Sequence, residues 1–343
     1  MTTTTVSIGS NQSIATVTPA SSSGSNPYVL TFTASVSANA AVGDIFVIED
    51  EVSFMATYTY LLTGISGSDY TLKQVSDGGT GYGDMSPYGN FMAYDESYNP
   101  VQASGTFKRA FSEITYFEEM VDDSSPSYWG SSDDVVGECH ADSAFTDSRV
   151  YFDNKQSLAS VKLTVHATDR HDGKAGTADK VVIRPTAGSG HNNAIIDVNI
   201  DNFIMEWIEI DLGSLDSTNT NKAVLFRGTN DDNIIRNNII HDKGGDPGGT
   251  GPFLIHVIGA GASGDTLSIL NNIIYSIIET SNDNAAAMLL DVWAGTMNVY
   301  NNTIYNVQSA GGSKIAIGIR YATPASSVAN VKNNIVAKLV SAA

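Results

Sequence analysis

Cysteine and cationic side chains are scarce in this sequence. The single cysteine, Cys139, excludes an intramolecular disulfide framework, and we expect it to be a small buried side chain. Only 18 Lys and Arg stand against 37 Asp and Glu, which gives a formal net charge of -19. With no basic cluster to offset it, this charge argues against partners such as nucleic acid or an anionic membrane surface.

Long apolar runs and an export signal are also missing. No stretch reaches the roughly 18 consecutive apolar residues of a membrane-spanning helix. The start, residues 1–8, has no basic region and no apolar core, so we predict no classical signal peptide. A role outside cells would then require lysis, incorporation into a virion, or a specialised route.

Helical periodicity is absent from the last third of the chain, where a short phrase recurs instead. Two asparagines are followed by two aliphatic or β-branched residues in four places: Asn237-Asn238-Ile239-Ile240, Asn271-Asn272-Ile273-Ile274, Asn301-Asn302-Thr303-Ile304 and Asn333-Asn334-Ile335-Val336. A degenerate copy, Glu206-Trp207-Ile208-Glu209, precedes them. A repeat of about 30 residues indicates stacked structural units.

The columns around the asparagines predict strands. Aliphatic residues stand two positions before each pair, at Ile235, Ile269, Val299 and Val331, and three positions after its first member. This is period two on both sides of a corner, and no window shows the spacing of a helical solenoid. With a further strand per repeat, each unit has the pattern of one coil of a parallel β-helix.

Asparagine suits such corners for two reasons. It tolerates the left-handed backbone of a sharp bend, and its side chain bonds nearby backbone groups. Stacked in coils about 4.8 Å apart, inward amides can form a hydrogen-bonded ladder. We therefore predict a structural turn ladder of Asn237, Asn238, Asn271, Asn272, Asn301, Asn302, Asn333 and Asn334.

These repeats resemble the right-handed parallel β-helix superfamily of pectate-lyase-like repeats, and most nearly uncharacterised β-helix proteins of phage and environmental origin. The resemblance rests on the Asn-Asn coils and on residues 107–119, 136–140, 144–147 and 170–176. It covers roughly residues 107–343 and implies an all-β, right-handed parallel β-helix. The superfamily holds polysaccharide lyases, hydrolases and phage tailspikes.

Three regions are expected. Residues 1–106 read as an N-terminal small β-barrel or sandwich module for attachment or oligomerisation, with a Gly- and Tyr-rich stretch at 77–100. Residues 107–125 contain an amphipathic helix, 112–122, placed to cover the open edge of the first coil. Residues 126–343 form the β-helix.

Carboxylates near the first Asn-Asn coils are the weak catalytic candidates. Glu206, Glu209 and Asp242 lie where one coil step would bring Glu206 beside Asn237. Glycan-cleaving enzymes use paired carboxylates, or a calcium-bound acidic cluster with a base. Nothing in the sequence fixes two of these carboxylates at the required separation, and solvated positions at corners are the favoured explanation of these residues.

No cofactor or metal site is predicted. The histidines, among them His140, His166, His171, His191 and His241, lack the spacing of a metal motif. His171 belongs to a loop segment that we expect to position backbone, and the Gly-rich loop at 242–251 lacks the ending of a phosphate loop.

An apolar and aromatic stripe is predicted on one outer flank. If the residue three positions after each first asparagine faces inward, the residues two and four positions after it face outward: Ile239, His241, Ile273, Tyr275, Thr303, Tyr305, Ile335 and Ala337. Such a stripe marks a subunit interface or the seat of a covering loop, whereas stacked tyrosines can also hold sugar rings. A register error of one residue would remove it.

Three functions remain open. The first is a non-enzymatic structural surface protein of a phage virion (capsid decoration protein, head fibre, or tail-fibre or spike subunit) that associates with itself and with other virion proteins. The second is a polysaccharide lyase or glycoside hydrolase. The third is a glycan-binding or self-assembling filament protein. All three place the chain on a virion surface or outside cells.

Overall fold

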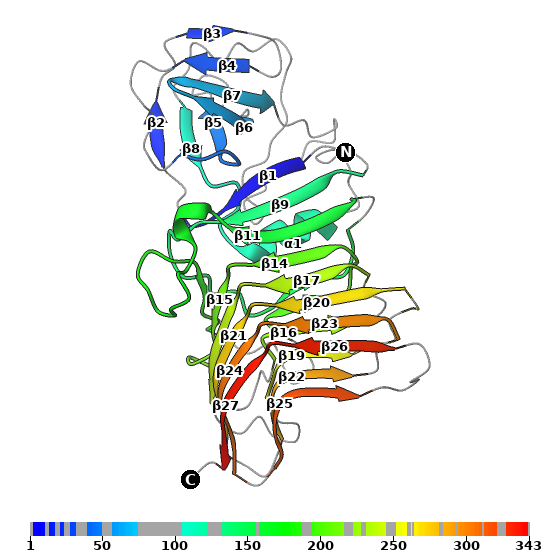
Figure 1. Ribbon diagram of the computed structural model, residues 1–343. Helices are drawn as coiled ribbons and strands as arrows, with labels where there is room; N and C mark the ends of the chain where they lie inside the picture. Colours follow the sequence, from blue (N-terminus) through cyan, green and yellow to red (C-terminus); the bar gives the residue numbers. More distant parts are fainter. Residues whose placement is uncertain are drawn as a thin grey trace. The chain divides into compact units, whose positions relative to one another are not determined.

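The computed structural model describes most of the chain in two compact units (Figure 1). The first unit comprises Met1–Asp142 with Gln156–Ala159, and the second comprises Ser143–Lys155 with Ser160–Ala343. The residues described are 3–10, 14–17, 21–23, 28–31, 40–49, 57–74, 105–122, 132–155, 158–186, 194–215, 222–227, 231–244, 252–258, 262, 264–280, 284–291, 294–310, 312–320 and 327–341. The Gly- and Tyr-rich stretch at 77–100 and His191 lie outside them.

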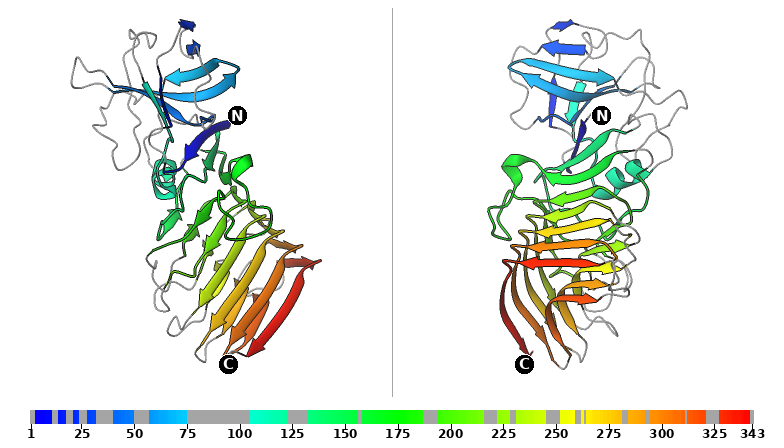
Figure 2. Two further views of the ribbon diagram at one scale, coloured as in Figure 1. Left: turned by 90° about the vertical axis from the view of Figure 1, so that its left-hand side faces the viewer. Right: turned by 45° about the vertical axis from the view of Figure 1, so that its right-hand side comes forward.

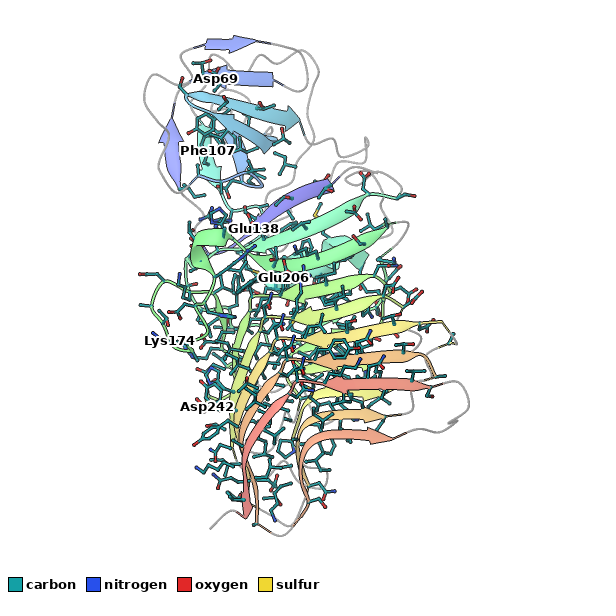
Figure 3. The ribbon with its side chains drawn as sticks, viewed as in Figure 1. Asp69, Phe107, Glu138, Lys174, Glu206 and Asp242 are labelled. Carbon is teal, nitrogen blue, oxygen red and sulfur yellow. The ribbon has the colours of Figure 1, made fainter. Side chains whose placement is uncertain are left out.

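The first unit contains an antiparallel sheet with the strand order β2-β8-β5-β6-β7-β4-β3. Its strands are β2 (Ala15–Val17), β3 (Ser21–Ser23), β4 (Tyr28–Thr31), β5 (Ile45–Glu49), β6 (Thr57–Ser66), β7 (Asp69–Gln74) and β8 (Gly105–Lys108). Phe107 is buried against Phe46 and Tyr70, with ring centroids 4.8 and 5.7 Å away (Figure 3). Because β8 spans position 106, the antiparallel sheet extends past the predicted edge of the N-terminal module.

One N-terminal strand lies outside that sheet. β1 (Thr3–Ile8) pairs in parallel with β9 (Asp134–Cys139), which carries the buried Cys139. Sequence alone had grouped residues 5–8 with the antiparallel strands, since neither its length nor its composition tells a parallel partner from an antiparallel one. β1 thus occupies an edge of β9 that we had expected the helix to protect.

The predicted helix is present as α1 (Ile114–Asp122). Ile114, Phe117 and Val121 form its buried face. Phe117 packs so closely on β9 that a Cβ added at Gly137 would lie 2.7 Å from its Cε1 atom. Glycine at position 137 therefore lets the helix seat directly on the strand. Within the described residues, no helix has the length and apolar character needed to cross a bilayer.

The second unit is a parallel β-helix with three sheets (Figure 2). The first sheet stacks β11 (Ser160–Val165), β14 (Phe203–Glu206), β17 (Asn233–Arg236), β20 (Thr266–Leu270), β23 (Thr296–Tyr300) and β26 (Val328–Lys332). The second stacks β12 (Val182–Ile183), β15 (Glu209–Asp211), β18 (Ile239–Gly244), β21 (Ile273–Glu279), β24 (Thr303–Ser309) and β27 (Ile335–Ser341). The third stacks β10 (Val150–Phe152), β13 (Ile196–Val198), β16 (Val224–Arg227), β19 (Phe253–Ile258), β22 (Ala285–Asp291) and β25 (Lys314–Arg320).

Aliphatic columns fill the interior of the β-helix. In the second sheet, the register aligns Ile210, Ile240, Ile274, Ile304 and Val336, and the four isoleucines are fully buried. Burial of each such side chain contributes about 1.5 to 3 kcal/mol, so the stacked columns supply most of the driving force for the fold. The predicted all-β fold with a parallel β-helix is confirmed.

Candidate functional site

The first asparagine of each repeat forms a corner in the left-handed backbone region. Asn237, Asn271, Asn301 and Asn333 have φ between 55 and 59°. Most L-residues lose about 1 to 2 kcal/mol there because Cβ crowds the following carbonyl oxygen, whereas asparagine adopts this region more readily. These corners turn the chain from the first sheet into the second.

The second asparagines face inward and form a continuous amide ladder. Each side-chain Nδ2 donates to the Oδ1 of the next coil: Asn238 to Asn272 at 3.1 Å, then Asn272 to Asn302 and Asn302 to Asn334, both at 3.0 Å. The same oxygens accept backbone N–H groups of the preceding coil. The ladder therefore satisfies polar groups at a corner that is closed to water.

Trp207 occupies the equivalent corner in the degenerate repeat. Its φ is 67°, an unfavourable region for so bulky a side chain. Its indole lies beside the imidazole of His171, with ring centroids 5.7 Å apart, and under the guanidinium of Arg170 at 5.2 Å. Where the other repeats have asparagine, this repeat thus has a tryptophan that contacts the neighbouring loop.

Glu206 bridges three neighbouring strands of the first sheet (Figure 3). Its carboxylate lies 2.5 Å from Lys162 Nζ on β11 and 2.6 Å from Arg236 Nε on β17, and it accepts a hydrogen bond from Thr164. The register sets Glu206 opposite Arg236, one residue before the Asn237 that we had expected. Burial raises the pKa of Glu206, but the hydrogen bonds and charges of Lys162 and Arg236 outweigh it and lower the pKa.

Glu209 and Asp242, the other two candidates, meet at one histidine on the second sheet. His241 Nε2 lies 3.1 Å from Glu209 Oε1, and His241 Nδ1 lies 2.9 Å from Asp242 Oδ2. The Tyr275 ring stacks on the imidazole at 4.9 Å with an angle of 2° between the planes. The structure thus brings Glu209 and Asp242 together and leaves Glu206 in a separate ion-pair network.

The immediate surroundings of His241 are acidic. Asp211 and Asp242 each have a carboxylate oxygen near an imidazole nitrogen, all within 4.8 Å of one another. Asp211 is itself engaged by Arg184 Nε at 2.8 Å and by the Gly213 amide at 2.9 Å. Both nitrogens of His241 face carboxylates, so the ring is engaged on either side by groups of the same chain.

A covering loop, residues 166–181, joins β11 to β12 and lies on this flank. The Gly176 amide donates to both oxygens of Glu209, at 3.0 and 3.1 Å. A Cβ added at Gly173 would lie 3.9 Å from Ile273 Cδ1 on β21. Figure 3 shows Lys174 of the loop and Asp242 on the same side of the β-helix. The loop therefore covers the part of the predicted stripe around Ile273.

The stripe residues differ in exposure along the flank. Ile239 and His241 are buried, and Ile273, Tyr275 and Thr303 are half-buried. Tyr305 is 47% exposed and Ile335 is 63% exposed, and the adjacent Ala337 is exposed as well. One part of the flank is thus covered by the chain itself, and the other part is open.

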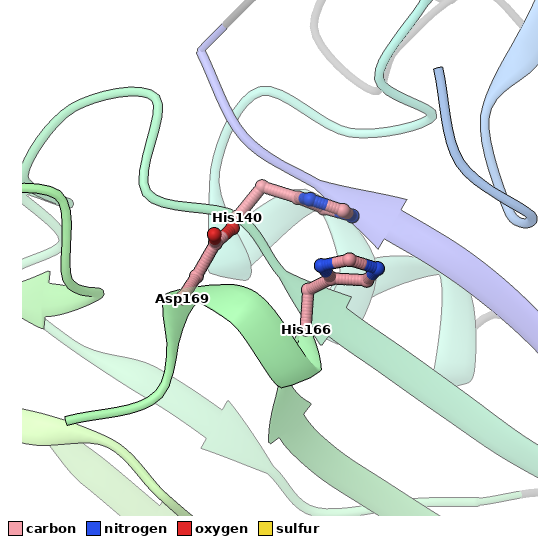
Figure 4. A group of neighbouring side chains, drawn as sticks. All are labelled: His140, His166 and Asp169. Carbon is pink, nitrogen blue, oxygen red and sulfur yellow. The ribbon is translucent and has the colours of Figure 1, made fainter. Parts of the chain in front are cut away.

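A short helix begins the covering loop. η2 (Ala167–Asp169) follows His166, and Figure 4 shows the side chains of His166 and Asp169. His166 Nδ1 lies 2.9 Å from Thr168 Oγ1, and Thr168 in turn donates to Asp169. His140, also drawn in Figure 4, follows β9 in the first unit. The hydrogen bonds of His166 and Asp169 with Thr168 indicate a role in shaping the loop.

Two residues that contact the candidate carboxylates were not predicted from the sequence. Arg236 precedes an Asn-Asn pair and gave no sign of pairing with Glu206, because no single residue type recurs in its column, which reads Glu206, Arg236, Leu270, Tyr300 and Lys332. Gly176 contacts Glu209 across 33 residues of sequence. The only signal for it was the family-like segment 170–176, which predicted a positioned loop without showing what the loop covers.

Comparison with known proteins gives limited information. No protein-family model matches the chain, and no curated protein matches it. Among solved structures, the tailspike protein gp49 from Pseudomonas phage LKA1 is 12% identical at a TM-score of 0.18, with 98% of this chain and 69% of that chain covered. The tailspike gp61 from Pseudomonas phage phi297 is 12% identical at a TM-score of 0.19, with 94% and 62% covered. Likeness at this level carries no argument about activity.

Proposed function

We propose that the chain is a non-enzymatic structural protein of a phage virion surface, such as a capsid decoration protein, head fibre, or tail-fibre or spike subunit. The resemblance of residues 107–343 to phage β-helix proteins supports a location on a phage virion. In this proposal the first unit serves attachment or oligomerisation, and the β-helix associates with copies of itself or with other virion proteins.

The state of the candidate carboxylates is the observation that carries this proposal. Glu206 is held between Lys162 and Arg236, and its lowered pKa is the opposite of what a general acid needs. Glu209 is 1% exposed and binds the backbone of the covering loop. The hydrogen bonds and ion pairs of both side chains therefore connect strands and a loop of the same molecule, which is a structural role.

The open part of the flank supports association. Tyr305 and Ile335 lie on adjacent strands in the outward columns, and both are exposed. Exposed apolar side chains that gather in one place commonly mark a protein interface. We propose that this part of the second sheet is covered by a protein partner.

Cryo-electron microscopy of the native particles and of the purified protein tests the proposal. We expect the chain at symmetric positions on a virion, or in a defined oligomer in solution. Ile335→Asp should abolish that association, while Ile258→Asp, which changes an exposed isoleucine on the third sheet, should leave it intact. A monomer that is absent from the particles would overturn the proposal.

The surroundings of His241 favour a second candidate, a glycan-active or glycan-binding β-helix. His241, Asp242 and Tyr275 combine a histidine, a half-exposed carboxylate and an aromatic ring, which are groups used in sugar recognition and cleavage. A degradation and binding screen over bacterial surface polysaccharides tests it. Activity that is lost in Glu209→Gln and Asp242→Asn, and kept in Glu206→Gln, would establish this function instead.

A further inference from the structure

The covering loop is fastened to the β-helix at few points. Most of its residues are exposed, and only His171 and Val181 are buried among residues 166–181. Its middle is held by the ring of His171 against Trp207 and by the Gly176 amide on Glu209. A loop with so few buried contacts opens locally at a much smaller free energy than the β-helix core.

Glu209, the anchor of the loop, is a buried carboxylate. It accepts the Gly176 amide on both oxygens and faces His241 Nε2 at 3.1 Å, its one ion-pair partner among the described residues. A buried carboxylate is costly unless hydrogen bonds and a nearby positive charge compensate it. Its ability to hold Gly176 therefore depends on the charge of the imidazole.

His241 has a carboxylate on each ring nitrogen. Carboxylates only accept hydrogen bonds, so both contacts are hydrogen bonds only when Nδ1 and Nε2 each carry a proton, which is the imidazolium form. Neutral imidazole has a single N–H and satisfies one of the two. The geometry thus selects the charged form while the loop is closed.

Other charged and titratable groups also surround the ring. Asp211 on β15 adds negative charge, partly balanced by Arg184, and Tyr275 on β21 stacks on the ring with its own pKa raised to about 12. Burial lowers the pKa of His241, but hydrogen bonds to Glu209 and Asp242 and the charges of Asp242 and Asp211 raise it above the ordinary value. On the loop side, His171 lies close enough to Glu209 to feel its charge, and burial lowers the pKa of His171.

We propose that His241 is a proton-operated latch: as imidazolium it sustains Glu209 as the anchor of Gly176, and loss of its proton releases the covering loop from the flank. Neutral His241 can still donate through Nε2, but it no longer compensates the buried charge. The β-helix core remains folded, because its aliphatic columns do not include the latch. Release uncovers Trp207 and Ile273 and so lengthens the open apolar part of the flank.

Hydrogen–deuterium exchange of the full chain from pH 5.5 to 10 tests the latch. After correction for the intrinsic pH dependence of exchange, protection of peptides spanning 170–181 should fall by up to about tenfold per pH unit as His241 loses its proton. Peptides from 285–291, a buried strand of the third sheet, serve as the internal control and should keep constant protection. Protection should be constant below the ordinary histidine pKa of about 6.5, fall above it, and level off at the pH where nuclear magnetic resonance shows His241 losing its proton in the closed protein.

Two variants separate the latch from general loosening at high pH. His241→Gln retains a neutral donor for Glu209, and it should show low, pH-independent protection of the loop. Asp242→Asn removes a half-exposed carboxylate, and it should move the loss of protection to lower pH with the fold intact. Unchanged protection in the unmodified chain across this range, or an unshifted profile in Asp242→Asn, would overturn the proposal.

Discussion

At the scale of single residues, asparagine has two different tasks in adjacent positions. The first member of each pair supplies a left-handed corner, and the second supplies a buried amide for the ladder. The sequence predicts both tasks because a left-handed corner and an inward amide each favour the same residue type. What it did not predict is Trp207 in a corner, since only the loop beside it explains a tryptophan there.

The corner role predicts a difference between two small substitutions. Asn271→Ala should destabilise the protein by about 1 kcal/mol, because alanine disfavours a φ of 56° more than asparagine does. Asn271→Gly should be nearly neutral, because glycine adopts this region freely. Urea unfolding measures both, and equal losses would contradict the backbone explanation.

The ladder role predicts a larger loss at the next position. Asn272→Ala leaves donors on Asn238 and the carbonyl of Ile235 without partners in a buried place, so we expect a loss of about 2 to 4 kcal/mol. Asn298→Ala, in the outward column of the neighbouring strand, is the matched control and should cost well under half as much. Comparable losses at the two positions would argue against the ladder.

At the scale of structural elements, ion pairs between strands and one loop anchor reinforce a core that is already stacked by aliphatic columns. The columns were predictable, because buried positions repeat at a fixed period. The Lys162–Glu206–Arg236 bridge and the Gly176–Glu209 anchor were not, because these charged and loop residues do not recur from coil to coil and their partners are set by three-dimensional register.

The bridge predicts a pH dependence of stability. The pKa of Glu206 is lowered in the folded protein, so its contribution is complete above the unfolded value of about 4.3 and is lost as pH falls through the folded pKa. Glu206→Gln should therefore be less stable than the unmodified chain at pH 7, by roughly 1 to 3 kcal/mol. The gap should close in acid, which urea unfolding at pH 7 and pH 3 will show.

At the scale of the whole molecule, charge is distributed unevenly along the chain. Residues 1–142 carry 18 Asp and Glu against 3 Lys and Arg, whereas no acidic residue follows Asp291 and the last coils carry Lys314, Arg320, Lys332 and Lys338. The exposed Ile335 and Tyr305 belong to this basic region. An acidic partner surface, including one on another copy of this chain, would complement it.

This asymmetry predicts that association through the flank weakens with salt. Raising the salt concentration from 0.05 to 0.5 M, values chosen to bracket a Debye length of roughly 10 Å, should weaken the apparent affinity several-fold. Sedimentation velocity measures the change, and Lys338→Gln should reduce the salt dependence. Association that strengthens with salt would instead indicate a purely apolar interface.

The asparagine ladder also makes coils interchangeable. Each coil presents the same corner, the same amide and the same aliphatic column to its neighbours, so a cut made at one corner can be rejoined at the next. Loss of residues 272–301 would join Asn271 directly to Asn302 and shorten the rod by one coil, about 4.8 Å, with the ladder unbroken. Length is therefore a trait that recombination between repeats can change in whole-coil steps, without any redesign of the core.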